Sequence, residues 1–181
     1  TPAVSAASSE LSSMLPLISE AISANIATAP IKSVKSVVDI PRMYRRTNRE
    51  TPSKPCPYIL HVIEAFTSFY SSQGRMAGAR DLEAWLGVAS DLVITQYLVQ
   101  VQDVLANVTK MEESLRKLKK VRERGGGGTG GKDKGGGLSD DDKIRLQLYL
   151  DVTHLVRVLE GGALGDMSRV LRGESCTKIK K

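Results

Sequence analysis

Apolar residues recur with heptad spacing along one stretch of the sequence, and this pattern constrains the fold more than any other feature. Two positions of the heptad form an apolar seam over four repeats, filled by Ile94, Val101, Val108 and Leu115 at the first and by Tyr97, Val104, Met111 and Leu118 at the second. Such a repeat is typical of a long helix that packs against others at a shallow angle. Leu98 and Leu105 widen the stripe, which favours a bundle of several helices over a two-stranded coil. We expect all eight seam positions to be buried.

The rest of the chain also predicts helices, because apolar residues recur there at steps of three and four. The 181 residues include only two Phe, one Trp and five Tyr, which weighs against a β-sandwich or barrel. Prolines shorten several helices, and Pro16 either kinks the first one or lies in its first turn. We expect helices within residues 11–26, 31–39, 41–49, 58–72, 76–124 and 138–161. The predicted fold is all-α, an elongated antiparallel bundle with one long heptad helix.

A glycine-rich stretch divides the last two helices. Residues 125–137 read GGGGTGGKDKGGG, and glycine buries no side chain while losing the most backbone entropy on ordering. Ser139 and the three aspartates after it predict a capped helix start. The expected organisation is a Ser/Ala-rich amphipathic helix at 1–30, a basic segment and the long bundle helices at 31–124, a flexible linker at 125–137, a returning bundle helix at 138–161, and a poorly ordered tail at 162–181.

Residues that carry enzyme chemistry are few and wrongly spaced for it. Cys56, Cys176, His61 and His154 show neither metal-ligand nor catalytic-triad spacing. A GxxxxGK match at residues 126–132 lacks the Ser or Thr that reaches magnesium, and no strand precedes it. No signal peptide or membrane-spanning run of about 18–20 apolar residues is visible. We therefore expect no enzyme activity, metal, cofactor or small-molecule substrate.

Positive charge is concentrated in two stretches of a chain whose net charge is +6. Residues 31–55 carry seven basic side chains against two acidic ones, and residues 110–124 carry seven against three. Within the first stretch, the sequence PRMYRRTNRE starts at Pro41. If it is helical, its arginines form one cationic stripe that suits carboxylates or phosphates. The candidate contacts to a partner protein or membrane are Arg42, Tyr44, Arg45, Arg46 and Arg49. The alternative is that these arginines pair with acidic residues of the same bundle.

Three blocks of sequence carry a family resemblance. PRMYRRTNRE, KMEESLRKLKK (residues 110–120) and SDDDKIRLQLYLDV (residues 139–152) resemble, in order, the C-terminal region of the second subunit of the conserved oligomeric Golgi complex. The resemblance covers roughly residues 31–160 and does not extend beyond Gly161. It implies a rod of stacked helical bundles, as in multisubunit tethering complexes.

What the resemblance implies about function is a non-enzymatic tether subunit. Such a subunit takes part in retrograde intra-Golgi transport, works peripherally at the cytoplasmic face of the Golgi membrane, and assembles with the first, third and fourth subunits of the complex. Contact with the Golgi membrane fits this setting, whereas nucleic acid does not. Two alternatives remain open on the residues alone: a basic coiled-coil homodimer, and a helical nucleic-acid-binding protein, although the basic stretches lack interleaved stacking aromatics.

Overall fold

The computed structural model describes residues 2–73, 76–124 and 138–160, and in these residues all regular structure is helical. The elements in chain order are α1 (Pro2–Val34), the 3₁₀ helix η1 (Lys35–Asp39), α2 (Ile40–Tyr44), α3 (Pro57–Gln73), α4 (Ala79–Arg124) and α5 (Asp140–Glu160). The predicted all-α fold is thus confirmed. The predicted linker at 125–137 and tail at 162–181 lie outside the described residues.

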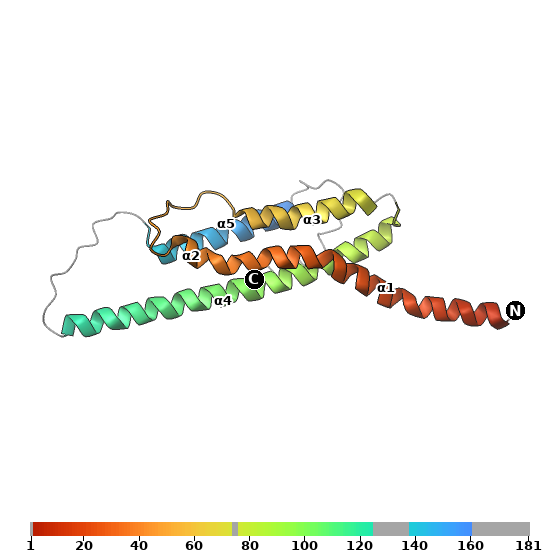
Figure 1. Ribbon diagram of the computed structural model, residues 1–181, viewed down its shortest axis with the longest axis horizontal. Helices are drawn as coiled ribbons and strands as arrows, with labels where there is room; N and C mark the ends of the chain where they lie inside the picture. The colour runs from red at the N-terminus through yellow and green to blue at the C-terminus, as the bar shows by residue number, and fades with distance from the viewer. Residues whose placement is uncertain (1, 74–75, 125–137, 161–181) are drawn as a thin grey trace.

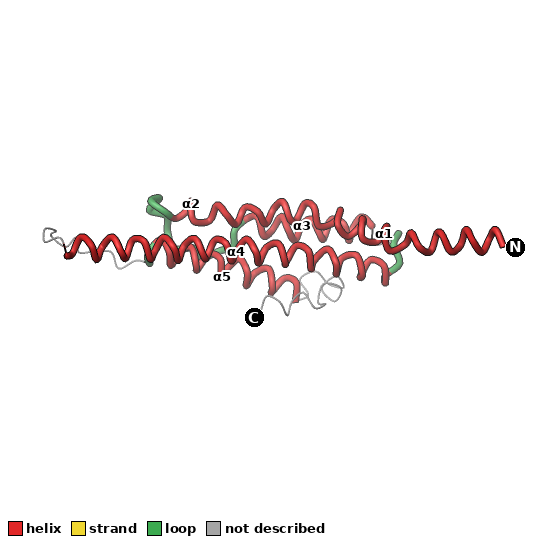
Figure 2. The backbone as a smooth tube through the Cα atoms, turned by 90° about the horizontal axis from the view of Figure 1, so that it is seen from below, coloured by secondary structure: helices red, strands yellow, loops and turns green. Residues whose placement is uncertain are grey.

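The four long helices form an elongated bundle in which successive helices alternate in direction (Figure 1). α1 packs against both α3 and α4, while the short α2 packs against α5. The first half of α1 projects from one end of the bundle, and the last turns of α4 project from the other (Figures 1 and 2). Both α1 and α4 therefore have one end that extends beyond the bundle and packs against no other described helix.

Three of the expected helices differ in extent from those in the structure. The helix expected over residues 31–39 is not separate, because α1 runs to Val34 and the 3₁₀ helix η1 covers Lys35–Asp39. α1 continues to Val34 through both Pro16 and Pro30, so Pro16 lies neither in a first turn nor at a helix end. The helix expected over residues 41–49 ends at Tyr44, and the chain from Arg45 to Cys56 is not helical. The correction matters for function because it removes the helical stripe of arginines. Its cause lies in contacts with α5, described below.

The heptad seam of α4 is buried only over its first part. Ile94, Tyr97, Val101, Val104 and Val108 lie in the core, together with apolar residues from every other helix. The expectation that all eight seam positions are buried is wrong for Met111, Leu115 and Leu118, which are 49%, 53% and 66% exposed. The reason is that α2 ends and α5 begins near this level of α4. Of the two flanking leucines, Leu98 packs partly against the core, whereas Leu105 is exposed.

The start of α5 is capped as the sequence predicts. The backbone N–H of Asp142 donates to Ser139 Oγ at 3.1 Å, and that hydroxyl donates to Asp142 Oδ2 at 2.7 Å. The aspartates of the first turn also lie at the positive end of the helix dipole, where negative charge is favourable. The cap fixes where α5 begins, and with it the position of the acidic side chains that meet the arginine segment (residues 42–49).

Two helical stretches pass a simple test for membrane spans, contrary to the sequence expectation. Residues 3–44 and 80–121 each contain an 18-residue window of mean hydropathy 1.2. They pass because alanine and aliphatic residues are frequent in these stretches and charges are few. The test depends on length and composition alone, and buried helices of bundles also satisfy it. The stretch at residues 80–121 includes the seam residues that form the core, so packing within the bundle accounts for part of its hydropathy.

Candidate interaction surface

A buried carboxyl group, that of Asp151 on α5, joins the elements around the bundle's centre. Asp151 Oδ1 accepts from the backbone N–H of Cys56 at 2.7 Å and from Gln147 Nε2 at 2.8 Å, and Oδ2 accepts from the Tyr58 hydroxyl at 2.8 Å. The Tyr58 and Tyr97 hydroxyl oxygens are 3.1 Å apart. Because Tyr58 gives its single proton to Asp151, Tyr97 is the donor in that pair. The carboxyl group thereby connects α5, α3, α4 and the segment before α3.

Gln147 extends this network toward the arginine segment. Its Oε1 accepts from the Tyr44 hydroxyl at 2.7 Å, and its Nε2 also donates to the carbonyl of Lys54 at 3.0 Å. Burial raises the pKa of Tyr44, and burial together with the Asp151 carboxyl raises the pKa of the Cys56 thiol to about 12. These groups are therefore protonated at neutral pH. The network holds helices together, and its thiol is inert rather than nucleophilic.

This network was not predicted, although the sequence carries one signal for it. Asp151 and Gln147 fall at helical spacing from Ile144 and Leu148, on the apolar face of α5. A polar residue on an apolar face must find hydrogen-bond partners or be destabilising. Four of the five hydrogen bonds that Asp151 and Gln147 make, however, join residues more than 90 positions apart, so the sequence alone could not identify these partners.

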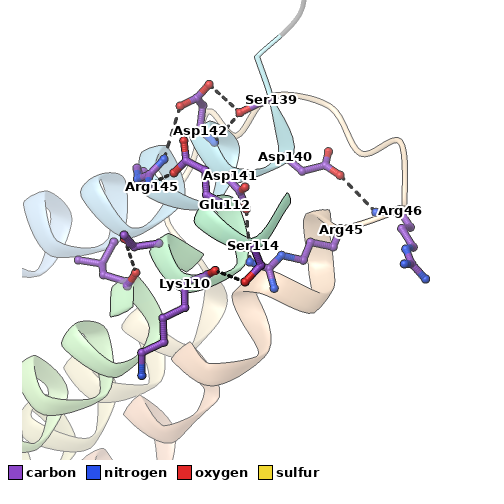
Figure 3. Close-up of polar contacts among 12 residues, drawn as sticks. Arg45, Arg46, Lys110, Glu112, Ser114, Ser139, Asp140, Asp141, Asp142 and Arg145 are labelled. Atoms are coloured by element: carbon purple, nitrogen blue, oxygen red, sulfur yellow. Dashed lines mark hydrogen bonds and ion pairs between the residues drawn. The ribbon is translucent and has the colours of Figure 1, made fainter. Parts of the chain in front are cut away.

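The arginine segment turns sharply where α2 ends. Arg45 is extended, and Arg46 and Asn48 have φ angles of 59° and 51°, in the left-handed region. For a residue such as arginine this conformation costs roughly 1–2 kcal/mol. The backbone N–H of Arg46 donates to Asp140 Oδ2 at 3.3 Å, which offsets part of that cost (Figure 3). The first turn of α5 therefore supplies an acceptor for the backbone N–H of Arg46, the first N–H that a continued α2 would have bonded.

Ion pairs surround the charged junction, the place where the end of α2 and the arginine segment meet the first turn of α5. Arg45 Nη2 lies 3.3 Å from Asp141 Oδ1, with both side chains partly buried, and Arg145 on α5 bonds Glu112 on α4 at 2.8 Å (Figure 3). Lys143 Nζ donates to the carbonyl of Arg49 at 2.7 Å. Exposed ion pairs contribute little stability. We therefore attribute the position of the arginine segment against α5 mainly to the partly buried Arg45–Asp141 pair.

The five candidate contact residues do not form one surface. Tyr44 is a correction, because its side chain is only 3% exposed and belongs to the buried network. Arg45 bonds Asp141, and the Arg49 guanidinium lies 5.9 Å from the centre of the Tyr44 ring, within the range of a cation–π contact. Arg42 and Arg46 are exposed, and the Arg46 side chain points away from α5 (Figure 3). The bundle therefore uses Tyr44, Arg45 and Arg49, of which Arg49 stays exposed, and it leaves the side chains of Arg42 and Arg46 at the surface.

A metal-binding cluster is absent from the described part of the chain. No three His, Cys, Asp or Glu side chains within residues 2–73, 76–124 and 138–160 lie close enough together to hold a metal ion. His61 is exposed, and its Nδ1 lies 3.2 Å from Glu64 Oε2 on the same helix. The features that stand out are the helix-joining network, the charged junction and the uncovered seam of α4.

These features define a class of protein: an all-helical bundle whose other helices pack along its longest helix, α4. The last turns of α4 have no neighbouring helix among the described residues. The family model for the COG complex component COG2, C-terminal, matches residues 1–152. The chain therefore belongs to the family of the C-terminal region of this conserved oligomeric Golgi complex component.

Individual relatives agree with the family match. The chain is 35% identical over 147 residues to conserved oligomeric Golgi complex subunit 2 of Homo sapiens, a match that covers 81% of this chain and 20% of that protein. It is 37% identical over 128 residues to the subunit 2 of Drosophila melanogaster, covering 71% and 18%. The Arabidopsis thaliana protein is 27% identical over 146 residues, covering 78% and 19%. The chain thus spans about a fifth of the length of these relatives, and no solved structure matches it significantly.

Proposed function

We propose that this chain is a non-enzymatic scaffold module of a Golgi vesicle-tethering complex, and that it serves retrograde intra-Golgi transport through contacts with other subunits. The observation that carries this proposal is the family match over residues 1–152, in a fold built of long helices. The chemistry of the centre agrees with a scaffold, since its buried polar groups are used to join helices. The comparisons give no support to a homodimeric coiled coil or to nucleic-acid binding.

Within this function we assign the exposed part of the arginine segment to a partner subunit, at the cytoplasmic face of the Golgi. Arg42 and Arg46 are exposed beside a junction whose geometry Arg45 and Asp141 maintain. An arginine side chain offers a planar set of donors that suits a carboxylate of a partner protein. The first, third and fourth subunits of the complex are the partners that the family resemblance suggests, and an anionic membrane surface is the competing target.

The test is charge reversal in the full-length subunit, expressed in cells that lack their own copy. With Arg42→Glu and Arg46→Glu together, we expect co-purification of the other subunits to fall several-fold. The reason is that attraction across the contact becomes repulsion. The matched control, Arg80→Glu with Arg157→Glu, makes the same charge change at exposed positions elsewhere on the bundle and should leave co-purification unchanged.

Three outcomes would count against parts of this proposal. Failure of the unmodified subunit to co-purify with any other subunit would contradict the scaffold function itself. Intact co-purification of the doubly reversed variant would contradict the assignment of Arg42 and Arg46. Intact co-purification with loss of Golgi association would transfer these two arginines to the membrane.

A further inference from the structure

The seam of α4 continues beyond the bundle. We call residues 109–121 the α4 overhang. Every residue in it is exposed, including Met111, Leu115, Leu118 and Val121. The first three of these continue the heptad register that is buried from Ile94 to Val108. The overhang therefore presents an apolar stripe in the same register that the bundle uses to pack its own helices.

The bundle is open to an additional helix at this point. Arg45, Arg46, Asp140 and Asp141 border an open hollow of about 240 Å³ whose apolar lining is Met111 and Leu115. The Arg145–Glu112 pair marks the last turn of α4 that α5 contacts through an ion pair. Beyond it, α4 projects alone at the end of the bundle (Figures 1 and 2). A helix that continues past α5 along α4 would extend the bundle's existing interface.

The charge of the overhang selects the chemistry of that helix. Its residues 109–121 include five basic side chains, Lys110, Arg116, Lys117, Lys119 and Lys120, against Glu112 and Glu113. Glu112 is already bonded to Arg145. A partner with acidic residues beside its own apolar seam would be attracted, whereas a basic partner would be repelled. The undescribed tail at residues 161–181 carries five basic residues against two acidic ones, so its charge is not complementary.

We propose that the α4 overhang is the docking site for an acidic amphipathic helix of another subunit. The inference rests on the proposed function for the origin of that helix. A membrane surface fits less well, because the seam is narrow and residues 109–121 contain no aromatic anchor. The overhang is roughly 20 Å long at 1.5 Å per residue, so the contact is one site within a larger assembly rather than a complete interface.

The test uses the full 181-residue chain and a fluorescent synthetic helix of about three heptads, with Leu in the seam and Glu on the flanks. A second peptide carries Lys in place of Glu. We expect the Glu peptide to bind about tenfold tighter or more, a difference of about 1.4 kcal/mol, and added salt to reduce the difference. Leu118→Asp should weaken its binding at least about tenfold. Val99→Asp is the matched control, since Val99 is an exposed aliphatic residue of α4 outside the overhang. This variant should bind the Glu peptide as tightly as the unmodified chain does.

Several results would overturn the inference. These are equal binding of both peptides, no binding, or a Leu118→Asp variant that binds as before. Binding of phosphatidylserine vesicles that Leu118→Asp abolishes, without binding of the Glu peptide, would assign the overhang to a membrane. Concentration-dependent self-association that Leu118→Asp abolishes would assign it to a second copy.

A crosslinking experiment separates this inference from the proposed function. A photo-crosslinking amino acid in place of Leu118, in the full-length subunit within the assembled complex, should capture an acidic helical segment of another subunit. An intact complex with no crosslink from this position would contradict the docking site and leave the proposed function standing. Binding of the Glu peptide by a subunit that joins no complex would contradict the proposed function instead.

Discussion

Asp151→Ala should destabilise the bundle by about 3–5 kcal/mol, because it removes the acceptor for three buried donors at once. A buried donor left without a partner costs about 1–3 kcal/mol, and the three losses are not strictly additive. The measurement is urea unfolding followed by circular dichroism. Since small domains are stable by about 5–15 kcal/mol, the variant should remain folded enough to measure.

Two further variants make the Asp151 experiment specific. Asp151→Asn keeps an acceptor for Cys56 and Gln147, and Tyr58 can then donate to Tyr97, so a cost of only about 1–2 kcal/mol is expected. Asp103→Ala removes an exposed carboxylate from α4 and should change stability by less than about 0.5 kcal/mol. If Asp151→Ala were no more destabilising than Asp103→Ala, the network would not hold the helices together.

Ile94→Ala should cost about 2–5 kcal/mol, whereas Leu115→Ala should change stability by less than about 0.5 kcal/mol. Both residues occupy the same seam position of the heptad, but Ile94 is 1% exposed and Leu115 is 53% exposed. Truncating Ile94 loses buried apolar contacts and leaves a cavity, while truncating Leu115 removes a group that is largely in water. The same urea titration measures both.

The paired design supplies its own control, because the two substitutions remove comparable side chains from one helix. Equal costs at Ile94 and Leu115 would show that the overhang packs against the chain in solution and is not available to a partner. A negligible cost at Ile94 would contradict the placement of the seam in the core.

The sequence predicted the helices well because their apolar spacing is local information. The range 58–72 corresponds to α3 and 76–124 to α4, each within a few residues of its observed bounds. The same spacing overestimated the buried seam, because periodicity identifies an apolar face without revealing whether this chain supplies the helix that covers it. Met111, Leu115 and Leu118 keep the pattern but have no covering helix among the described residues.

The candidate site was predicted less completely, because its geometry depends on residues distant in sequence. Nothing between Arg45 and Glu50 indicates that Asp140 and Asp141 will take the place of further helical turns. The capping role of the aspartates near Ser139 was predictable from their position, whereas their contact with the arginines was not. The burial of Tyr44 could not be predicted for the same reason, since its partner Gln147 lies 103 residues further along the chain.

α4 uses the first part of its seam for folding, and we propose that it leaves the second part for a partner. Hydrogen exchange along α4, measured on the free chain, distinguishes the two parts. Backbone amides from Ile94 to Val108 should exchange only through global unfolding, whereas those from Glu113 to Val121 should exchange orders of magnitude faster through local fraying. Equal, strong protection along the whole of α4 would contradict this proposal, because the overhang would then already be covered.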